Sequence, residues 1–122
     1  MKNIITRLAL CTAIALVAIQ SNANAQSQQE MNRQAARDFD AADSALNRVY
    51  KQLTDKLDKE SQSKLKAVQR AWVQFRDAEA QFEADLEARG GTMAPLIYNG
   101  TRASLTKTRT KELQLVLKDY GR

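Results

Sequence analysis

The chain has 122 residues, one cysteine, no histidine and a formal net charge of +5 at pH 7. This length suits one small domain with a single core, and the mild charge, without a basic stripe interleaved with aromatics, does not indicate nucleic-acid binding. Because histidine is absent and the only cysteine lies near the N-terminus, we expect no metal site, no cofactor and no His- or Cys-based nucleophile.

The N-terminus has the features of a bacterial export signal. Lys2 and Arg7 give it a basic start, residues 8–19 form an uncharged and mostly apolar run, and residues 23–25 (Ala-Asn-Ala) supply a small-x-small cleavage pattern. The run is shorter than the ~20 residues that span a bilayer. We therefore predict a cleaved signal peptide over residues 1–25.

The remaining chain, residues 26–122, is predicted to be one periplasmic or secreted domain. Cys11 lies inside the apolar run and follows the bulky Leu10, which argues against lipidation, so no membrane anchor is expected after cleavage. Cleavage removes two basic residues and no acidic one, which leaves a net charge of about +3. The cleaved domain has no cysteine, so it must be stable through packing alone.

The first predicted helix begins near Met31 and ends before a break over residues 58–61. Its apolar residues recur three or four positions apart, which is typical of a helix buried along one face. They are Met31, Ala35, Phe39, Ala42, Leu46, Val49, Leu53 and Leu57. Either Asp58 or Ser61 could cap the next helix.

Two further helices are predicted. The second has a core-facing stripe made of Leu65, Val68, Trp72, Phe75, Phe82 and Leu86, and ends at Gly90-Gly91. The third starts near Pro95, carries Tyr98, Leu105, Val116 and Tyr120 on one side, and ends near Gly121. Short breaks between three helices predict an all-α fold, a small antiparallel three-helix bundle.

Four charged residues lie in or beside these stripes. Glu79 and Arg109 fall inside the arcs of their helices, while Asp43 and Arg76 lie on the shoulders of theirs. Folding the chain about its two breaks brings all four to one level, so we predict a structural polar cluster that fixes helix register. Two alternatives are a catalytic or ligand-binding carboxylate, and side chains that reach outward to water.

Charge is unevenly distributed along the last two helices. Residues 77–87 contain five acidic residues and no basic one, whereas basic residues predominate from Arg102 onward. The two helices could simply attract each other, or the acidic end could bind a basic partner. In the second case the contact surface would be the loop over residues 88–96 with its acidic neighbours, and the candidate residues are Glu83, Asp85, Glu87, Thr92 and Met93.

Catalysis has little support. Glu79 and Glu83 lie one turn apart and could be imagined as a glycosidase pair, but this spacing is common on solvated helices and a narrow bundle offers no sugar cleft. We therefore predict that the protein is not an enzyme.

Several motifs occur together over most of the cleaved chain. They are Met31-Asn32, Ala42-Asp43, Leu46-Asn47, Tyr50, Gln69-Arg70-Ala71-Trp72, Phe75-Arg76-Asp77-Ala78-Glu79, Gly90-Gly91, Met93, Pro95, Tyr98, Leu105-Thr106 and Arg109. In this order they resemble the lysozyme inhibitor LprI-like N-terminal domain family. The resemblance implies a small helical domain of the bacterial envelope, with lysozyme inhibition as the namesake activity. Many members have no assigned role, and members often carry cysteines where this chain has Gln34, Ala80 and Thr101.

The expected function is thus that of an exported, non-catalytic binding protein similar to lysozyme inhibitors, acting through the acidic patch and the loop 88–96. Its partner would be a lysozyme or another envelope protein. The alternative is a structural or interaction module of the envelope without inhibitory activity. Oligomeric state does not follow from these patterns.

Overall fold

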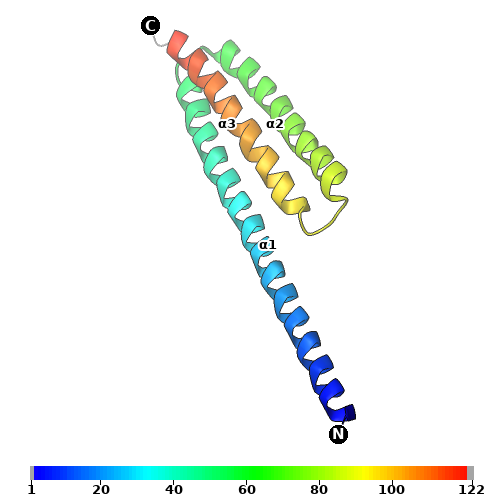
Figure 1. Ribbon diagram of the computed structural model, residues 1–122. Helices are drawn as coiled ribbons and strands as arrows, with labels where there is room; N and C mark the ends of the chain where they lie inside the picture. Colours follow the sequence, from blue (N-terminus) through cyan, green and yellow to red (C-terminus); the bar gives the residue numbers. More distant parts are fainter. Residues whose placement is uncertain (1, 121–122) are drawn as a thin grey trace. The chain divides into compact units, whose positions relative to one another are not determined.

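The structure, a computed structural model, describes the backbone of residues 2–120 and the side chains of residues 20–120. Met1 and the side chains of residues 2–19, all in the predicted signal peptide, lie outside this description, as do Gly121 and Arg122. The described chain forms α1 (Lys2–Thr54), α2 (Lys59–Ala88) and α3 (Ala94–Tyr120), shown in Figure 1. The chain divides into two compact units, residues 1–31 and 32–122. The second unit contains the three-helix bundle, and the predicted all-α class is confirmed.

Part of the first unit bears on two expectations. Residues 26–30, which precede the predicted start of the first helix at Met31, are already helical and belong to α1. Among residues 20–120, whose side chains are described, no helix has an apolar stretch long enough to cross a bilayer.

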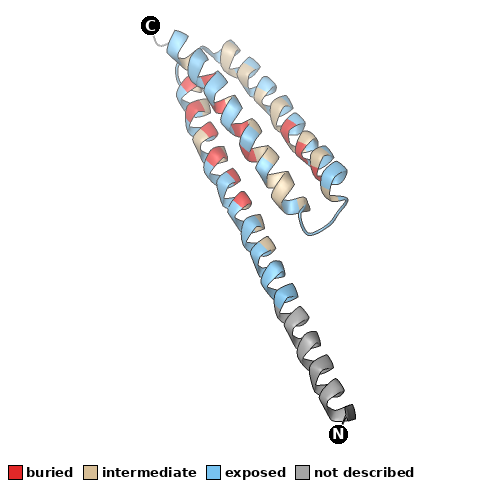
Figure 2. Ribbon diagram, viewed as in Figure 1, coloured by how far each residue is buried: buried red, intermediate tan, exposed pale blue. Residues whose placement is uncertain are grey.

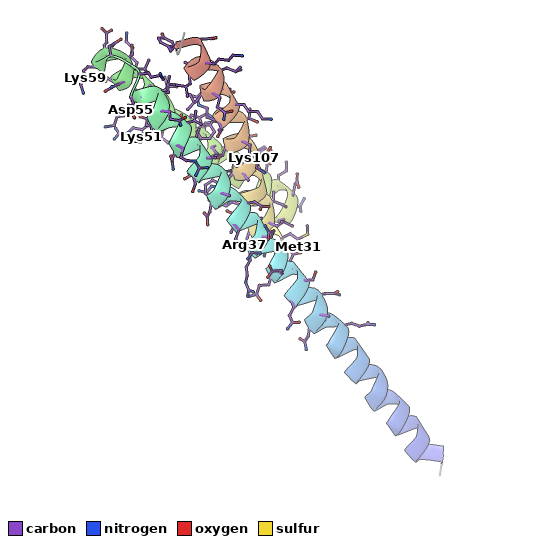
Figure 3. All side chains as sticks on the ribbon, turned by 90° about the vertical axis from the view of Figure 1, so that its left-hand side faces the viewer. Met31, Arg37, Lys51, Asp55, Lys59 and Lys107 are labelled. Carbon is purple, nitrogen blue, oxygen red and sulfur yellow. The ribbon has the colours of Figure 1, made fainter. Side chains whose placement is uncertain are left out.

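The turn between α1 and α2 is fixed by side chains that bond free backbone groups. Of the two candidate caps, Asp58 is the N-cap of α2: its Oδ1 accepts from the Ser61 backbone N–H at 2.9 Å, and the Ser61 hydroxyl donates to Oδ2. These hydrogen bonds hold the pKa of Asp58 below its usual value. Gln62 Nε2 donates to the Thr54 and Leu57 carbonyls, which satisfies the end of α1. Figure 3 labels Lys51, Asp55 and Lys59 at this end of the bundle.

The turn between α2 and α3 is built from left-handed backbone. Arg89 (φ 46°) and Gly90 (φ 76°) both adopt this conformation, although only glycine adopts it without steric strain. A Cβ on Gly91 would lie 3.0 Å from the Ala88 carbonyl oxygen, so this position also favours glycine. Asn32 Nδ2 of α1 donates to the Thr92 carbonyl at 2.9 Å and holds the turn against the bundle.

The core follows the predicted stripe of α1. Its buried residues run along one face and appear red in Figure 2: Ala35, Phe39, Ala42, Leu46, Val49 and Leu53. Leu46, Val49 and Leu53 form one cluster with Leu113 of α3. Tyr50, Leu57, Leu65, Trp72 and Leu117 pack around this cluster. Met31, the first residue of the predicted stripe, is exposed.

The predicted core face of α2 is confirmed for Leu65 and Trp72, which pack around the core cluster, and is wrong for its other four residues. Val68, Phe75, Phe82 and Leu86 are 53–64% exposed, and the buried residues of α2 are Arg76, Ala80 and Ala84. The helix is therefore turned by roughly a third of a turn from the predicted orientation. On α3, likewise, Val116 and Tyr120 are exposed, while Ala103, Thr106, Thr110 and Leu113 are buried. Apart from Arg76 and Leu113 these buried residues are small, so α2 and α3 pack closely and leave no room for phenylalanine between them.

Candidate functional site

Arg76 is the centre of a polar network that joins the three helices. Its side chain extends from the buried face of α2, and only 4% of the residue is exposed. Nη1 donates to Asp43 Oδ1 of α1 at 3.1 Å, and Nε donates to Asp77 Oδ1 at 2.8 Å. A buried guanidinium is costly to leave unpaired. The two carboxylates therefore make it possible for an arginine to occupy this buried position.

Arg102 of α3 completes the network. Its Nε donates to Asp77 Oδ1 at 3.1 Å, so one carboxylate oxygen accepts from two arginines. Its guanidinium carbon lies 3.6 Å from the ring centre of Phe39, and that of Arg76 lies 5.0 Å from the same ring. Both distances are typical of cation–π contacts. We refer to Asp43, Arg76, Asp77 and Arg102, with Phe39, as the arginine network.

The charges of the arginine network balance within it. Partial burial raises the pKa of Asp77, but the hydrogen bonds and positive charges of Arg76 and Arg102 outweigh this effect and hold the pKa below its ordinary value of 3.8. Two guanidinium groups and two carboxylates thus face one another. Each member has a partner of opposite charge, so the arrangement ties the three helices together.

The structure distributes the residues of the predicted polar cluster over three places. Asp43 and Arg76 are paired in the arginine network. Arg109 Nε donates to Gln69 Oε1 at 3.2 Å and Nη1 donates to Glu112 Oε2 at 2.9 Å. Gln69 is ten residues before Glu79 on α2, about 15 Å along the helix, so Arg109 and Glu79 do not share a level. Among residues 20–120, Glu79 is half-buried and makes no ion pair.

The rotation of α2 explains this difference. Turning Arg76 inward moves Glu79 toward the exposed face, and Asp77 supplies the second carboxylate in its place. Asp77, Arg102 and the ring of Phe39 are therefore network members that the predicted cluster lacks. A signal for Arg102 exists in the sequence: with Leu105 at zero it lies at about 60° on the helical wheel, close to Arg109.

The predicted partner-binding residues lie at the other turn of the bundle. Asp85 and Glu87 are exposed on the last turns of α2, and the half-buried Glu83 accepts a hydrogen bond from the Thr101 hydroxyl. Thr92 and Met93 are exposed in the turn itself, although the Thr92 carbonyl is bonded to Asn32. We call these five residues, Glu83, Asp85, Glu87, Thr92 and Met93, the acidic loop surface.

A shallow hollow adjoins the acidic loop surface. It has a volume of about 260 Å³ and lies between the end of α2 and the start of α3, lined by Gln81, Ala84, Ala94, Pro95, Tyr98 and Asn99. A larger open groove of about 670 Å³ lies between α1 and α2, lined by Tyr50, Lys66, Gln69, Arg70, Val73 and Gln74. Within residues 20–120, no group of three His, Cys, Asp or Glu side chains is placed to hold a metal ion.

Comparison with known proteins identifies the family. Residues 19–113 match the family described as lysozyme inhibitor LprI. An uncharacterised protein of Rhizobium meliloti (strain 1021), R02472, is 40% identical over 103 residues, which cover 74% of this chain and 73% of the relative. The chain belongs to the lysozyme inhibitor LprI family, and the resemblance found in its motifs is confirmed.

A solved structure supports the fold. The crystal structure of a DUF1311 family protein from Pseudomonas putida KT2440 superposes with a TM-score of 0.67, covering 73% of this chain and 92% of the other. The two sequences are 22% identical, so this similarity shows a shared fold and carries no statement about activity.

Proposed function

We propose that the protein is an exported, non-catalytic inhibitor of a lysozyme and that the acidic loop surface makes the contact. Family membership over residues 19–113 is the observation that carries this proposal. The family's namesake activity requires binding to an enzyme, and an exported location would bring the two proteins together. Residues 1–25 have the pattern of a cleaved signal peptide, which fits this location.

The geometry of the loop favours it as the contact. Left-handed backbone at Arg89 and Gly90, the hydrogen bond from Asn32 to Thr92 and the close approach at Gly91 all restrict its conformation. A restricted loop loses less conformational entropy on binding than a flexible one. The hollow beside it offers room for a side chain of the partner.

Electrostatics favour the same surface. Chicken-type lysozymes are basic, and a chain with net positive charge would repel them at long range. A local cluster of carboxylates can offset this repulsion at the point of contact. Asp85 and Glu87 are exposed and Glu83 is half-buried, so these three carboxylates are available to a basic partner.

Inhibition can be tested with protein expressed from the full-length gene and recovered from the periplasm of a bacterial host. Mass spectrometry would first show whether cleavage follows Ala25. Lysis of cell-wall substrate by chicken-type and goose-type lysozymes would then be measured at low and moderate salt. We expect inhibition that weakens as salt rises, because exposed charges are screened. Absence of inhibition at micromolar concentrations under all conditions would contradict the proposal.

The contact surface needs a matched control. In the test variant Glu83→Gln, Asp85→Asn and Glu87→Gln remove three carboxylates from the acidic loop surface while keeping similar shapes. In the control Asp55→Asn, Glu60→Gln and Asp119→Asn remove three exposed carboxylates from elsewhere on the bundle. The test variant should lose most inhibition and the control should retain it. Equal loss in both would indicate that net charge, and not this surface, controls binding.

An envelope interaction module without inhibitory activity is the second candidate. The exposed apolar face of α2 favours it, because large apolar side chains aligned on a surface commonly bind another protein. A protein that remains folded and exported but inhibits neither type of lysozyme would support this alternative.

A further inference from the structure

The exposed face of α2 has the spacing of a coiled-coil interface. Seven positions alternate three and four residues apart and form one stripe: Leu65, Val68, Trp72, Phe75, Glu79, Phe82 and Leu86. Six are apolar, as at the a and d positions of successive heptads. Leu65 and Trp72 pack against the core at one edge of the stripe, but Val68, Phe75, Phe82 and Leu86 are more than half exposed. We call these seven residues the outer stripe.

The neighbours of the outer stripe leave it accessible to another helix. Ala67, Ala71 and Ala78 are exposed beside it, and their small side chains would allow a second helix to approach closely. The residues by which α2 packs into its own bundle, Arg76, Ala80 and Ala84, lie on a different face. A regular heptad pattern without a partner indicates a missing helix more specifically than an irregular apolar patch would.

The charges along α2 show how that helix would run. Its first part has exposed Lys59, Lys64, Lys66 and Arg70 against the single carboxylate of Glu60. Its last part has Glu79, Glu83, Asp85 and Glu87. A second copy of α2 in parallel would place like charges together, whereas an antiparallel copy would place the basic part of each helix near the acidic part of the other.

One antiparallel register pairs six of the seven residues of the outer stripe, all except Leu65. With Val68 facing Leu86 of the second copy, Trp72 faces Phe82 and Phe75 faces Glu79, and the same pairs repeat across the two-fold axis. The two Glu79 carboxylates are then offset along the helices by about 6 Å and do not face each other directly. A polar residue in an otherwise apolar stripe is a known means of fixing register, at some cost in stability.

We propose that two copies of this chain associate through the outer stripe, with their α2 helices antiparallel and centred near Asp77. The interface is self-complementary, as a two-fold axis requires. The proposal does not depend on inhibition of lysozyme. It predicts a dimer whether or not the acidic loop surface binds an enzyme.

Association can be measured by sedimentation of the exported protein from about 1 to about 300 µM, a range that covers weak self-association. The average mass measured by sedimentation should rise with protein concentration toward twice the monomer mass. Phe75→Ser combined with Phe82→Ser should weaken association about 100-fold or more. The circular dichroism spectrum of this variant should remain helical, which would show that it still folds. Leu115→Ser, which removes an exposed leucine from α3, should leave the strength of association unchanged. A protein that stays monomeric at every concentration overturns the proposal. This holds even if that monomer binds lipid vesicles through the outer stripe.

Cysteine cross-linking tests the orientation. Cys11 is the only cysteine in the sequence and can be changed to serine in every variant. Val68→Cys and Leu86→Cys, made in separate chains and mixed under oxidising conditions, should form a disulfide between unlike chains, because these positions face each other in the antiparallel register. Each variant alone should cross-link poorly. Efficient cross-linking of each variant with itself would indicate parallel helices and overturn the proposed arrangement.

Discussion

Helices α1 and α2 each carry a stripe of large apolar residues at helical spacing, yet only α1 buries most of its stripe. Phe39, Leu46 and Leu53 are in the core, whereas Phe75, Phe82 and Leu86 of α2 face outward. Instead, α2 turns an arginine and two alanines toward its own bundle. Helical periodicity therefore locates a stripe but does not decide whether that stripe faces the interior of the same molecule.

The difference has a physical cause in the partners of each helix. α1 meets leucines from both other helices and Trp72 of α2, so a large apolar side chain gains contacts there. α2 and α3 approach through alanine and threonine, and Arg76 must point inward to reach Asp43. The close packing and the arginine network together set the rotation of α2.

The same substitution on both stripes gives the sharpest contrast. Phe39→Ala should destabilise by about 3–5 kcal/mol, because it leaves a cavity and removes the ring that contacts Arg76 and Arg102. Phe75→Ala should change stability by less than about 0.5 kcal/mol at a concentration where the chain is monomeric. Urea unfolding would measure both. Similar losses at the two positions would mean that α2 buries its stripe after all.

A somewhat smaller loss is expected on the buried face of α2. Arg76→Ala should cost about 3 kcal/mol, because Asp43 and Asp77 would lose their shared partner inside the bundle. Arg76→Lys keeps the charge but cannot bond both carboxylates in the same fork geometry, so its loss should be intermediate. If Arg76→Ala were as stable as the natural protein, the arginine network would not determine the orientation of α2.

Acid should weaken the same network. The pKa of Asp77 is lowered in the folded state, so its contribution to stability is complete above the unfolded pKa of about 4 and is lost as pH falls through the folded value. Stability measured from pH 7 downward should therefore stay nearly level to about pH 5 and then decline. Asp77→Asn should be less stable at pH 7 and should show a shallower decline. An identical pH profile in both proteins would remove Asp77 from this effect.

The smallest effect concerns α3. The Thr106 hydroxyl is buried and has no hydrogen-bond partner among the described residues. Thr106→Val removes this hydroxyl with little change of shape and should stabilise the protein by about 1 kcal/mol. The hydroxyl of Thr110, one turn along α3, donates to the Thr106 carbonyl at 2.9 Å. Thr110→Val is therefore a control in which no gain in stability is expected. Destabilisation by Thr106→Val would indicate that the hydroxyl does have a partner in solution.

Several features could be predicted from the sequence for clear reasons. The stripe of α1 extends over many turns, Asp58 and Gly90 mark the two breaks, and the motif order indicates the family. Folding about the first break also places Asp43 near Arg76, which is where the structure has it.

Other features could not be predicted because they depend on packing between helices. Apolar spacing alone favours burying Phe75 over Ala80, and the close α2–α3 contact together with the arginine network reverses this preference. The prediction that Glu79 lies in the polar cluster rested on the same assumption, that α2 buries its large apolar residues. Asp77 lies well away from the predicted stripe on a helical wheel, so its bonds to two arginines become apparent only when the side chains are placed.

Trp72 gives the protein a built-in optical reporter. It is the only tryptophan in the sequence, and its ring lies within 6.0 Å of the guanidinium carbons of both Arg76 and Arg109. The side chain packs against the core, and the position also belongs to the outer stripe. Its ultraviolet emission therefore comes from a single site that senses both loosening of the bundle and occupation of the exposed face of α2, so both events can be followed without attaching a dye.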